Sequence, residues 1–289
     1  MDVFGSSGVR GVANEELTPA LALDVAQAAG SVLGAERVAV GQDTRLTGTV
    51  FVDSVASGLA SVGCDVDRVG VVPTPALQAY CAREGVPGVM VTASHNPPEF
   101  NGLKLVGPDG VELTRDRLSA IETALAGETE RAAWDRTGDT THVEGVNRAY
   151  REEIVAAVDR ERIAGADLTV ALDPGHGSGS LTSPDIFSEL GCAVKTVNAQ
   201  PDGTFPGRNP EPVAETLADL GRLVRATDAD VGIAHDGDAD RAMFFDERGR
   251  LVEGDAALAA LVAAEIEAGD TVVSAVNASQ RLVDVCEAA

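Results

Sequence analysis

The chain has 289 residues, and its 22 basic and 46 acidic side chains leave a formal net charge of −24. Because such a charge repels phosphate backbones, we expect no nucleic-acid partner. With 44% hydrophobic residues, the chain is also too apolar for a disordered acidic polymer. Its longest apolar run, 256–264, is too short to span a membrane, and no secretion signal is visible. These features predict a soluble cytoplasmic protein.

The positive charge is almost entirely arginine, because lysine occurs only at Lys104 and Lys195. Acidic side chains are spread along the whole chain and do not gather in a tail. A salt-rich cytoplasm would screen their mutual repulsion, so this composition is typical of a halophile. The four cysteines lie far apart without a CxxC pair, which predicts free thiols.

Short β-branched runs alternate with amphipathic helical stretches from the N-terminus onward. Thr18 and Pro19 form a helix start, with threonine as N-cap and proline at the first helical position. Residues 37–41 predict a strand, a helix follows from Thr49 to near Gly63, and residues 88–92 predict a second buried strand. This alternation predicts an α/β fold of repeated strand–turn–helix domains, with mixed, mostly parallel sheets covered by helices.

The strand–turn–helix unit occurs three times, beginning at 38–40, 169–172 and 271–274, the third with a helix from about Ser279. In the third unit the chain stops where the helix of the other two ends at a glycine. A unit without its return strand cannot bury its apolar face, so we expect a fragment of a longer protein. Polar stretches at 127–147 and 246–250 separate the units and predict domains at 1–135 and 148–248 and an incomplete one at 252–289.

Three aspartates follow the apolar run 231–234 at alternating positions: Asp236, Asp238 and Asp240. Alternate side chains of an extended loop point to one side, so the carboxylates converge and require a cation. Oxygen ligands alone favour Mg²⁺ or Ca²⁺. The spacing also fits the start of an EF-hand, but Arg241 stands where that loop requires glycine, and residues 242–245 predict a strand where a helix should begin. A solvated acidic turn is the remaining alternative.

A second polar loop, TASHNPPEFNGLK, occupies residues 92–104 directly after the predicted strand. Its Asn-Pro-Pro forces a rigid turn and should hold Ser94 and His95 on an exposed loop at the carboxyl end of a strand, where α/β proteins bind ligands. The Ser-His pair by itself is equally compatible with a structural turn. Lys104, retained in a lysine-poor chain, favours a functional loop.

The third candidate is the N-terminal loop FGSSGVRG, residues 4–11. Its glycines and serines, Ser7 among them, expose N–H groups and hydroxyls to an anion, and Arg10 adds a fork-shaped donor. A flexible terminus is the alternative interpretation of this loop on its own.

Together and in this order, the three loops resemble those of the α-D-phosphohexomutases, which comprise phosphoglucomutases, phosphomannomutases and phosphoglucosamine mutases. The resemblance implies four α/β domains around a cleft, of which this chain holds two and the start of the third. It implies that Ser94 carries a phosphoryl group and, with the aspartates of the DGDADR loop, binds Mg²⁺. Hexose 1-phosphate and hexose 6-phosphate would interconvert through a hexose bisphosphate. The residues that the resemblance places around the transferred phosphate are Ser7, Arg10, His95, Lys104 and Arg241.

By the resemblance, we expect the family's sugar-recognition loop, its loop for the non-transferred phosphate and its fourth domain to lie beyond Ala289, so that domain IV is absent from these residues. We therefore expect the 289 residues alone to be inactive, and the sequence does not select glucose, mannose or glucosamine phosphate. The FGSSGVRG opening resembles the form found in phosphoglucosamine mutases and archaeal phosphohexomutases, which with the acidic composition suggests a haloarchaeal protein.

His95 and Lys104 are both candidates for the general base, and oligomeric state is left open. A metal-dependent sugar-phosphate phosphatase and a non-catalytic Ca²⁺-binding or scaffold module are the alternative functions.

Overall fold

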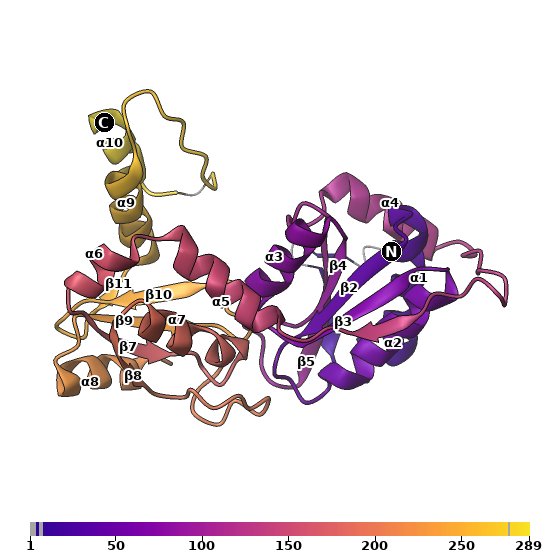
Figure 1. Cartoon of the computed structure of the whole chain (residues 1–289), viewed down its shortest axis with the longest axis horizontal. Coiled ribbons are helices and arrows are strands. Elements are labelled where there is room, and N and C mark those ends of the chain that lie inside the picture. Colours follow the sequence, from indigo (N-terminus) through magenta and orange to yellow (C-terminus); the bar gives the residue numbers. More distant parts are fainter. Residues whose placement is uncertain (1–3, 6–7, 277) are drawn as a thin grey trace.

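The computed structural model describes residues 4–5, 8–276 and 278–289, in which two α/β halves lie side by side and a helical pair projects from the second (Figure 1). Each half has its own sheet, and the chain passes between them once, through the segment that follows α4. Within the described part of the chain, no helix has the length and apolar character that crossing a bilayer requires.

The first half contains one six-stranded sheet in the order β1-β5-β4-β2-β3-β6. The strand β2 lies at its centre and pairs in parallel with β3 and β4, whereas β5 runs antiparallel to β4 and β1. The sheet is therefore mixed, with helices in the crossovers between its parallel strands. The elements of this half are β1 (Val9–Val12), α1 (Pro19–Leu33), β2 (Arg37–Gln42), α2 (Gly48–Ser61), β3 (Asp65–Val71), α3 (Thr74–Glu84), β4 (Gly88–Val91), β5 (Phe100–Val106), α4 (Arg115–Leu125) and β6 (Thr140–His142).

The start of α1 is as predicted, and a glycine defines its end. The Thr18 side chain accepts a hydrogen bond from the Leu21 N–H, and Pro19 begins the helix. Gly34 ends it in the left-handed conformation, with φ of 59°. The predicted strand at 37–41 and the helix from about Thr49 are likewise confirmed as β2 and α2.

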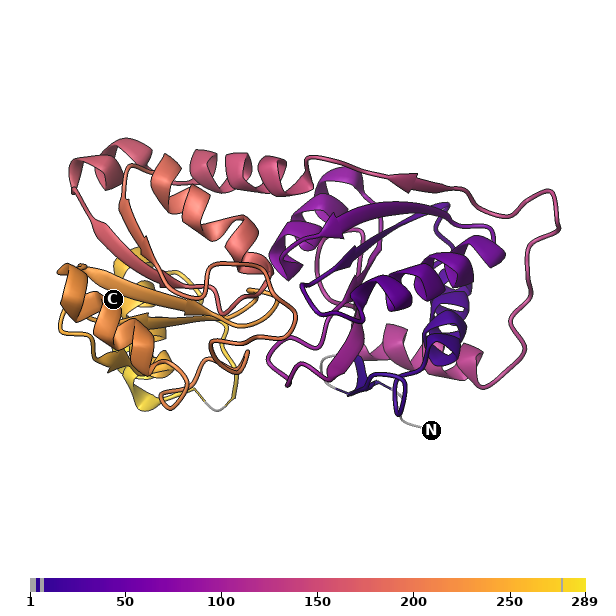
Figure 2. The same ribbon diagram turned by 90° about the horizontal axis from the view of Figure 1, so that it is seen from below.

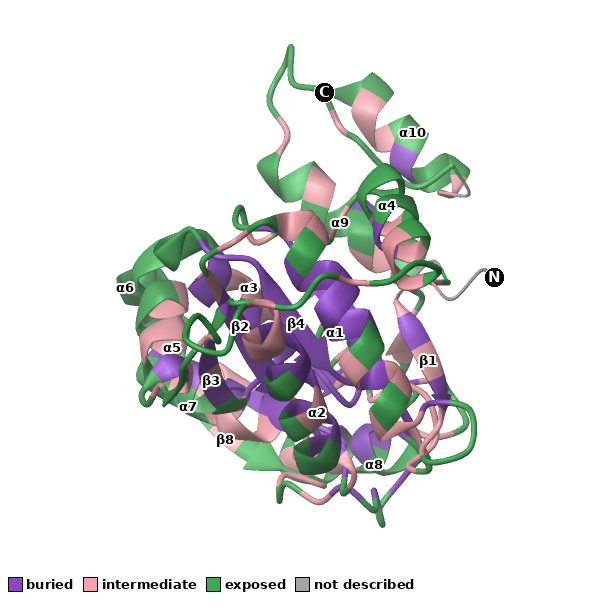
Figure 3. Cartoon of the chain, turned by 90° about the vertical axis from the view of Figure 1, so that its right-hand side faces the viewer, coloured by how far each residue is buried: buried purple, intermediate pink, exposed green. Residues whose placement is uncertain are grey.

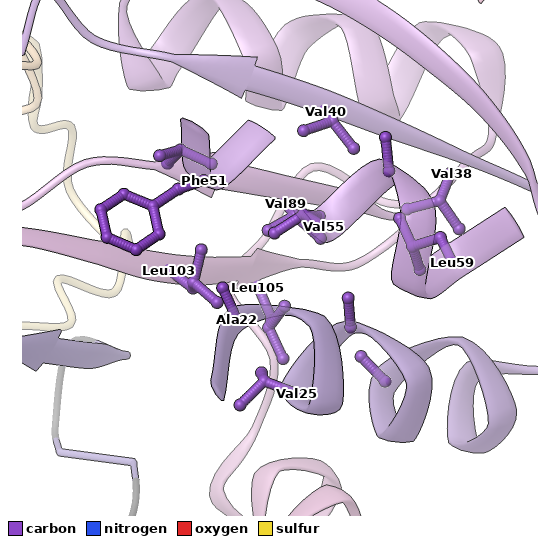
Figure 4. Close-up of a cluster of buried hydrophobic side chains, with 14 of the residues drawn as sticks. Ala22, Val25, Val38, Val40, Phe51, Val55, Leu59, Val89, Leu103 and Leu105 are labelled. Carbon is purple, nitrogen blue, oxygen red and sulfur yellow. The ribbon is translucent and has the colours of Figure 1, made fainter. Parts of the chain in front are cut away.

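The core of this half lies on both faces of the sheet. On one face Phe51, Val55 and Leu59 of α2 pack with α1 and α4 against the strands (Figure 4). On the other face Leu77 of α3 packs against Met90. Because successive strand residues point to opposite faces, residues 38–41 of β2 and all of β4 are apolar and buried, and Figure 3 shows these strands as the buried centre of this half.

The polar stretch 127–147 runs along the first half before the chain enters the second (Figure 2). Residues 140–142 of this stretch form β6, which adds to the edge of the first sheet beside β3. The first sheet therefore includes residues beyond position 135.

The second half repeats the arrangement around β7, in the order β11-β10-β9-β7-β8. Like β2, β7 pairs in parallel with two neighbours, β8 and β9, and an antiparallel strand, β10, follows β9. α8 covers one face of this sheet, and α5 and α7 cover the other. The elements are α5 (Val146–Ala157), α6 (Arg160–Gly165), β7 (Thr169–Asp173), the 3₁₀ helix η1 (Ser178–Leu181), α7 (Ser183–Glu189), β8 (Ala193–Thr196), α8 (Ala218–Thr227), β9 (Val231–His235), β10 (Ala242–Phe245) and β11 (Leu251–Val252).

The last two helices, α9 (Gly254–Glu265) and α10 (Gln280–Ala288), pack against each other. The predicted helix from about Ser279 is confirmed, but the predicted strand at 271–274 is wrong: these residues form no regular element, and Val273 is 90% exposed. A strand needs a partner for its backbone hydrogen bonds, and among the described residues no strand lies beside this segment to supply one.

Candidate active site

The serine loop (residues 92–99) and the aspartate loop (residues 236–241) meet between the two halves. The serine loop follows β4 and the aspartate loop follows β9, and these strands occupy equivalent positions in the two sheets. Each loop therefore leaves the carboxyl end of a strand next to the central one, which is the edge where open α/β sheets bind ligands.

Ser94 is the point of contact between these loops. Its Oγ donates a hydrogen bond of 2.6 Å to Oδ2 of Asp236. The expectation of an exposed Ser94 is wrong, because the residue is 1% exposed, covered by the aspartate loop of the other half. Its backbone lies in the left-handed region, with φ of 51°, which is rare for residues other than glycine.

The three aspartates offer oxygen atoms within 4.8 Å of one another, as the alternation predicts. Asp236 and Asp238 are fully buried, and Oδ1 of Asp238 has no hydrogen-bond partner among the described residues. A buried carboxylate oxygen without a partner and an all-oxygen donor set fit a hard divalent cation such as Mg²⁺ or Ca²⁺. The loop is not an EF-hand, because β9 precedes it and β10, a strand, follows it.

The charges of this site are only partly balanced by the protein. Burial, together with the neighbouring Asp238 and Asp240, raises the pKa of Asp236 to about 8. Burial also opposes the charge of Asp240, but the Lys104 ammonium outweighs it and holds that pKa below its usual value. Lys104 is buried, hydrogen bonded to Asp240 and 3.4 Å from Oδ2 of Asp238; its pKa is raised because the two carboxylates outweigh the effect of burial.

Thr74, the first residue of α3, fastens the aspartate loop to the first half. Its Oγ1 donates to Oδ2 of Asp238 at 2.6 Å, and its N–H donates to the Asp238 carbonyl at 2.9 Å. Nothing in the sequence marks Thr74 as a site residue, because a Thr-Pro pair is an ordinary helix start. Only the packing of the two halves gives its hydroxyl a partner.

Of the other predicted residues, His95 lies beside Ser94, and Arg10 contacts the serine loop at Asn96. Nδ1 of His95 is 3.4 Å from Ser94 Oγ, and burial followed by the nearby Arg241 and Arg10 lowers the pKa of His95, so the imidazole is neutral at pH 7. Arg10 donates from Nη1 to Oδ1 of Asn96 at 3.0 Å, while its buried Nε has no partner in the part of the chain that the structure describes.

Arg241 and Ser7 are the remaining two predicted residues, and only Arg241 lies among the described residues. The Arg241 side chain is exposed, with Nε 4.0 Å from Asp240, and its N–H donates to Oδ1 of Asp236 at 3.2 Å. Ser7 lies outside the described residues. The structure thus brings together the three aspartates, Ser94, His95 and Lys104, with Arg10 and Arg241 at the margin of the group.

Comparison with known proteins matches both halves to one family. The models for phosphoglucomutase/phosphomannomutase alpha/beta/alpha domains I and II match residues 1–132 and 148–249. The phosphoglucomutase/phosphomannomutase of Thermococcus kodakarensis is 44% identical over 99% of this chain and 64% of its own length. A "probable phosphoglucosamine mutase" of Methanopyrus kandleri is 46% identical over 89% of this chain and 56% of its own length.

Solved structures agree in fold. A phosphoglucomutase/phosphomannomutase family protein from Burkholderia thailandensis is 29% identical with a TM-score of 0.80, covering 91% of this chain and 58% of the other. The phosphoglucomutase parafusin from Paramecium, 21% identical, shares the fold with a TM-score of 0.84 over 100% of this chain and 61% of its own. The chain spans less than two thirds of the length of each of these four proteins.

Proposed function

The chain belongs to the phosphoglucomutase/phosphomannomutase family, and on that premise we propose that the whole protein is a phosphohexomutase that depends on Mg²⁺. It would interconvert hexose 1-phosphate and hexose 6-phosphate, with Ser94 as the phosphoryl carrier and a hexose bisphosphate as intermediate. The observation that carries the proposal is the 2.6 Å contact between Ser94 Oγ and Asp236. It joins a hydroxyl that can accept a phosphoryl group to a carboxylate cluster that can hold a metal ion.

The metal would be held by Asp236, Asp238 and Asp240, and when bound it would offset charge on the phosphate oxygens. The chain's own residues would do the rest. A hydroxyl oxygen of the hexose bonds to the phosphorus of phosphorylated Ser94 as the bond from phosphorus to Oγ breaks. When Ser94 takes the other phosphate back, the same exchange runs in reverse with the second hydroxyl.

The structure favours one of the two candidates for proton acceptor. Lys104 has a raised pKa because two carboxylates surround it, so it stays protonated and supplies positive charge. His95 has a lowered pKa and is neutral at pH 7, so a nitrogen of its ring is free to take the hydroxyl proton. We therefore assign the base to His95, and charge stabilisation to Lys104 with Arg10 and Arg241.

The substrate in this proposal is a hexose phosphate, and the names of the relatives include enzymes for glucose, mannose and glucosamine phosphates. The relatives extend well beyond the length of this chain, and remote contacts normally hold a bisphosphate while it turns over. We accordingly expect the 289 residues by themselves to bind metal without mutase turnover. The cytoplasmic location and the adaptation to high salt stay predictions.

The test is phosphoryl transfer by the whole protein. Incubated with radiolabelled hexose 1,6-bisphosphate and Mg²⁺, it should take up label at Ser94, while Ser94→Ala takes up none and Ser119→Ala, at an exposed serine, is labelled normally. Glucose, mannose and glucosamine 1-phosphates are then assayed for isomerisation. Label at another residue would contradict the role of Ser94, and release of inorganic phosphate without isomerisation would identify a phosphatase instead.

A further inference from the structure

A buried ion pair that the proposed mechanism does not use lies behind the serine loop. Asp43 and Arg45 follow the end of β2, and their side chains are both 0% exposed, with Arg45 Nε 3.1 Å from Asp43 Oδ2. Removing two charges from water is costly, so such a pair persists where its remaining donors and acceptors are also satisfied. The partners of these atoms therefore indicate what the pair is for.

Arg45 directs its guanidinium at the backbone of the serine loop. Nη2 donates to the carbonyl oxygens of Ser94 at 2.9 Å and Asn96 at 2.6 Å, and Nη1 donates to those of Pro97 and Phe100. With Nε on Asp43, all five N–H donors of the side chain are used. The planar fork of an arginine can bind this many carbonyl groups at once, whereas the compact ammonium of a lysine cannot.

Thr92 connects the N–H group of Ser94 to the same ion pair. Its Oγ1 donates to Oδ2 of Asp43 at 2.7 Å and accepts a hydrogen bond of 2.8 Å from the Ser94 N–H. Both backbone polar groups of Ser94 are thus tied, directly or through Thr92, to the same buried pair. A left-handed conformation at a residue other than glycine is strained and persists only where its surroundings hold it, as this network holds Ser94.

We propose that Arg45, with Asp43 and Thr92, is a positioning device that holds Ser94 in the conformation that directs its Oγ at the aspartate loop. The inference rests on the proposed function. None of the three residues touches Oγ in the structure, so they act through the backbone of Ser94. Phe205 of the second half lies over the Arg45 guanidinium, 5.3 Å from Cζ to the ring centroid, and joins this device to the other half.

The second half contains an equivalent arrangement, which supplies a matched comparison. Asp173 ends β7, the counterpart of β2, and pairs with the buried Arg208 at 3.0 Å. Nη2 of Arg208 donates to the carbonyl of His235, the residue before Asp236. Arg45 therefore holds the loop of the phosphoryl carrier, and Arg208 holds the loop of the carboxylates.

The experiment compares Arg45→Lys with Arg208→Lys in the whole protein, and Thr92→Val with Thr92→Ser. The readouts are the rate of Ser94 labelling by hexose 1,6-bisphosphate, the kcat and KM of isomerisation, and Mn²⁺ affinity measured by electron paramagnetic resonance. Circular dichroism confirms that each variant is folded. Valine matches threonine in shape, so Thr92→Val removes the hydroxyl with little change in packing.

We expect Arg45→Lys to slow Ser94 labelling about 100-fold, since misplacing a reacting group by about 1 Å costs on this order, with Mn²⁺ affinity within threefold of wild type. Arg208→Lys should instead weaken Mn²⁺ binding about tenfold. Thr92→Val should lower kcat at least about tenfold with KM nearly unchanged, and Thr92→Ser should restore most of the rate.

Labelling of Arg45→Lys at the wild-type rate, or equal kcat for Thr92→Val and Thr92→Ser, would overturn the inference. So would a parallel fall of labelling and Mn²⁺ affinity in both arginine variants, because that result indicates general scaffolding. If wild-type protein takes up no label at Ser94, the proposed function fails and this inference fails with it. Normal labelling of both wild type and Arg45→Lys refutes only the inference.

Discussion

Replacing Gly237 by alanine tests how closely the two loops must approach. Gly237 lies between Asp236 and Asp238, and a Cβ built on it would be 2.6 Å from the carbonyl oxygen of Ser94. Cβ atoms essentially never come within 3.0 Å of another heavy atom in this way, so the two backbones must separate by at least about 0.4 Å. Gly237 is not among the residues with positive φ, so alanine adds no backbone strain there.

The aspartate loop has little freedom to absorb this shift by turning aside. On its other side the Gly237 carbonyl accepts a hydrogen bond of 3.0 Å from the Ser178 N–H, and the neighbouring Asp238 is bound to Thr74. The separation must therefore lengthen the contact between Ser94 and Asp236. We expect Gly237→Ala to slow Ser94 labelling about 10- to 100-fold, because displacements of this order at a reacting centre have effects of that size.

The assay measures labelling by hexose 1,6-bisphosphate in the whole protein, with Mn²⁺ affinity measured alongside. Gly165→Ala is the control, because nothing lies within 4 Å of a Cβ at that position in α6 and labelling should be unchanged. If Gly237→Ala is labelled as fast as wild type, the close approach of the two loops is not required and the reasoning from this contact is refuted.

Three further predictions concern metal binding, thiols and the core. At pH 7 Mg²⁺ binding should release a proton from Asp236, because the pKa of this carboxyl is raised to about 8, and Mg²⁺ affinity should therefore increase as the pH rises toward 8. Calorimetry in buffers of different ionisation enthalpy measures the proton release, and a constant Mg²⁺ affinity from pH 6 to 8 would contradict the prediction. At pH 8 the partly exposed Cys286 should react first with a thiol reagent. Burial raises the pKa of Cys81 to about 12, so this thiol should react only after unfolding, and equal reaction rates for the two cysteines would refute the prediction. Phe51→Ala should lower the free energy of unfolding of the first half by about 3–5 kcal/mol, since the ring is fully buried. Denaturant titration measures this free energy, and a decrease below about 1 kcal/mol would be inconsistent with the observed packing.

Local patterns in the sequence were sufficient for the secondary structure that carries the site. Thr18 and Pro19 act on their own neighbours, so the start of α1 follows from the local sequence alone. The apolar runs at 88–92 and 231–234 became the strands β4 and β9, and the loops after them carry the serine and the aspartates as expected. The repeat also predicted that the two halves would be built alike.

Burial and long-range pairing were decided only by tertiary structure. Ser94 and Asp236 are 142 positions apart, and their hydrogen bond depends on how one half sits on the other, which no local pattern encodes. The same is true of Thr74, an ordinary helix start until the aspartate loop packs against it. The strand predicted at 271–274 does not form, because β propensity yields no strand without a neighbouring strand to pair with.

Arg45 shows most clearly how the tertiary structure differs from what the local sequence indicates. In the sequence, Asp43 and Arg45 are an unremarkable polar turn after a strand, of the kind that usually lies in solvent. In the fold they are fully buried, because the loop that follows the adjacent strand closes over them and offers its carbonyl groups as acceptors. The sequence by itself determined which residues could do chemistry. The packing of separate segments decided which of them meet, because desolvation and hydrogen bonding act between groups that only the folded chain brings together.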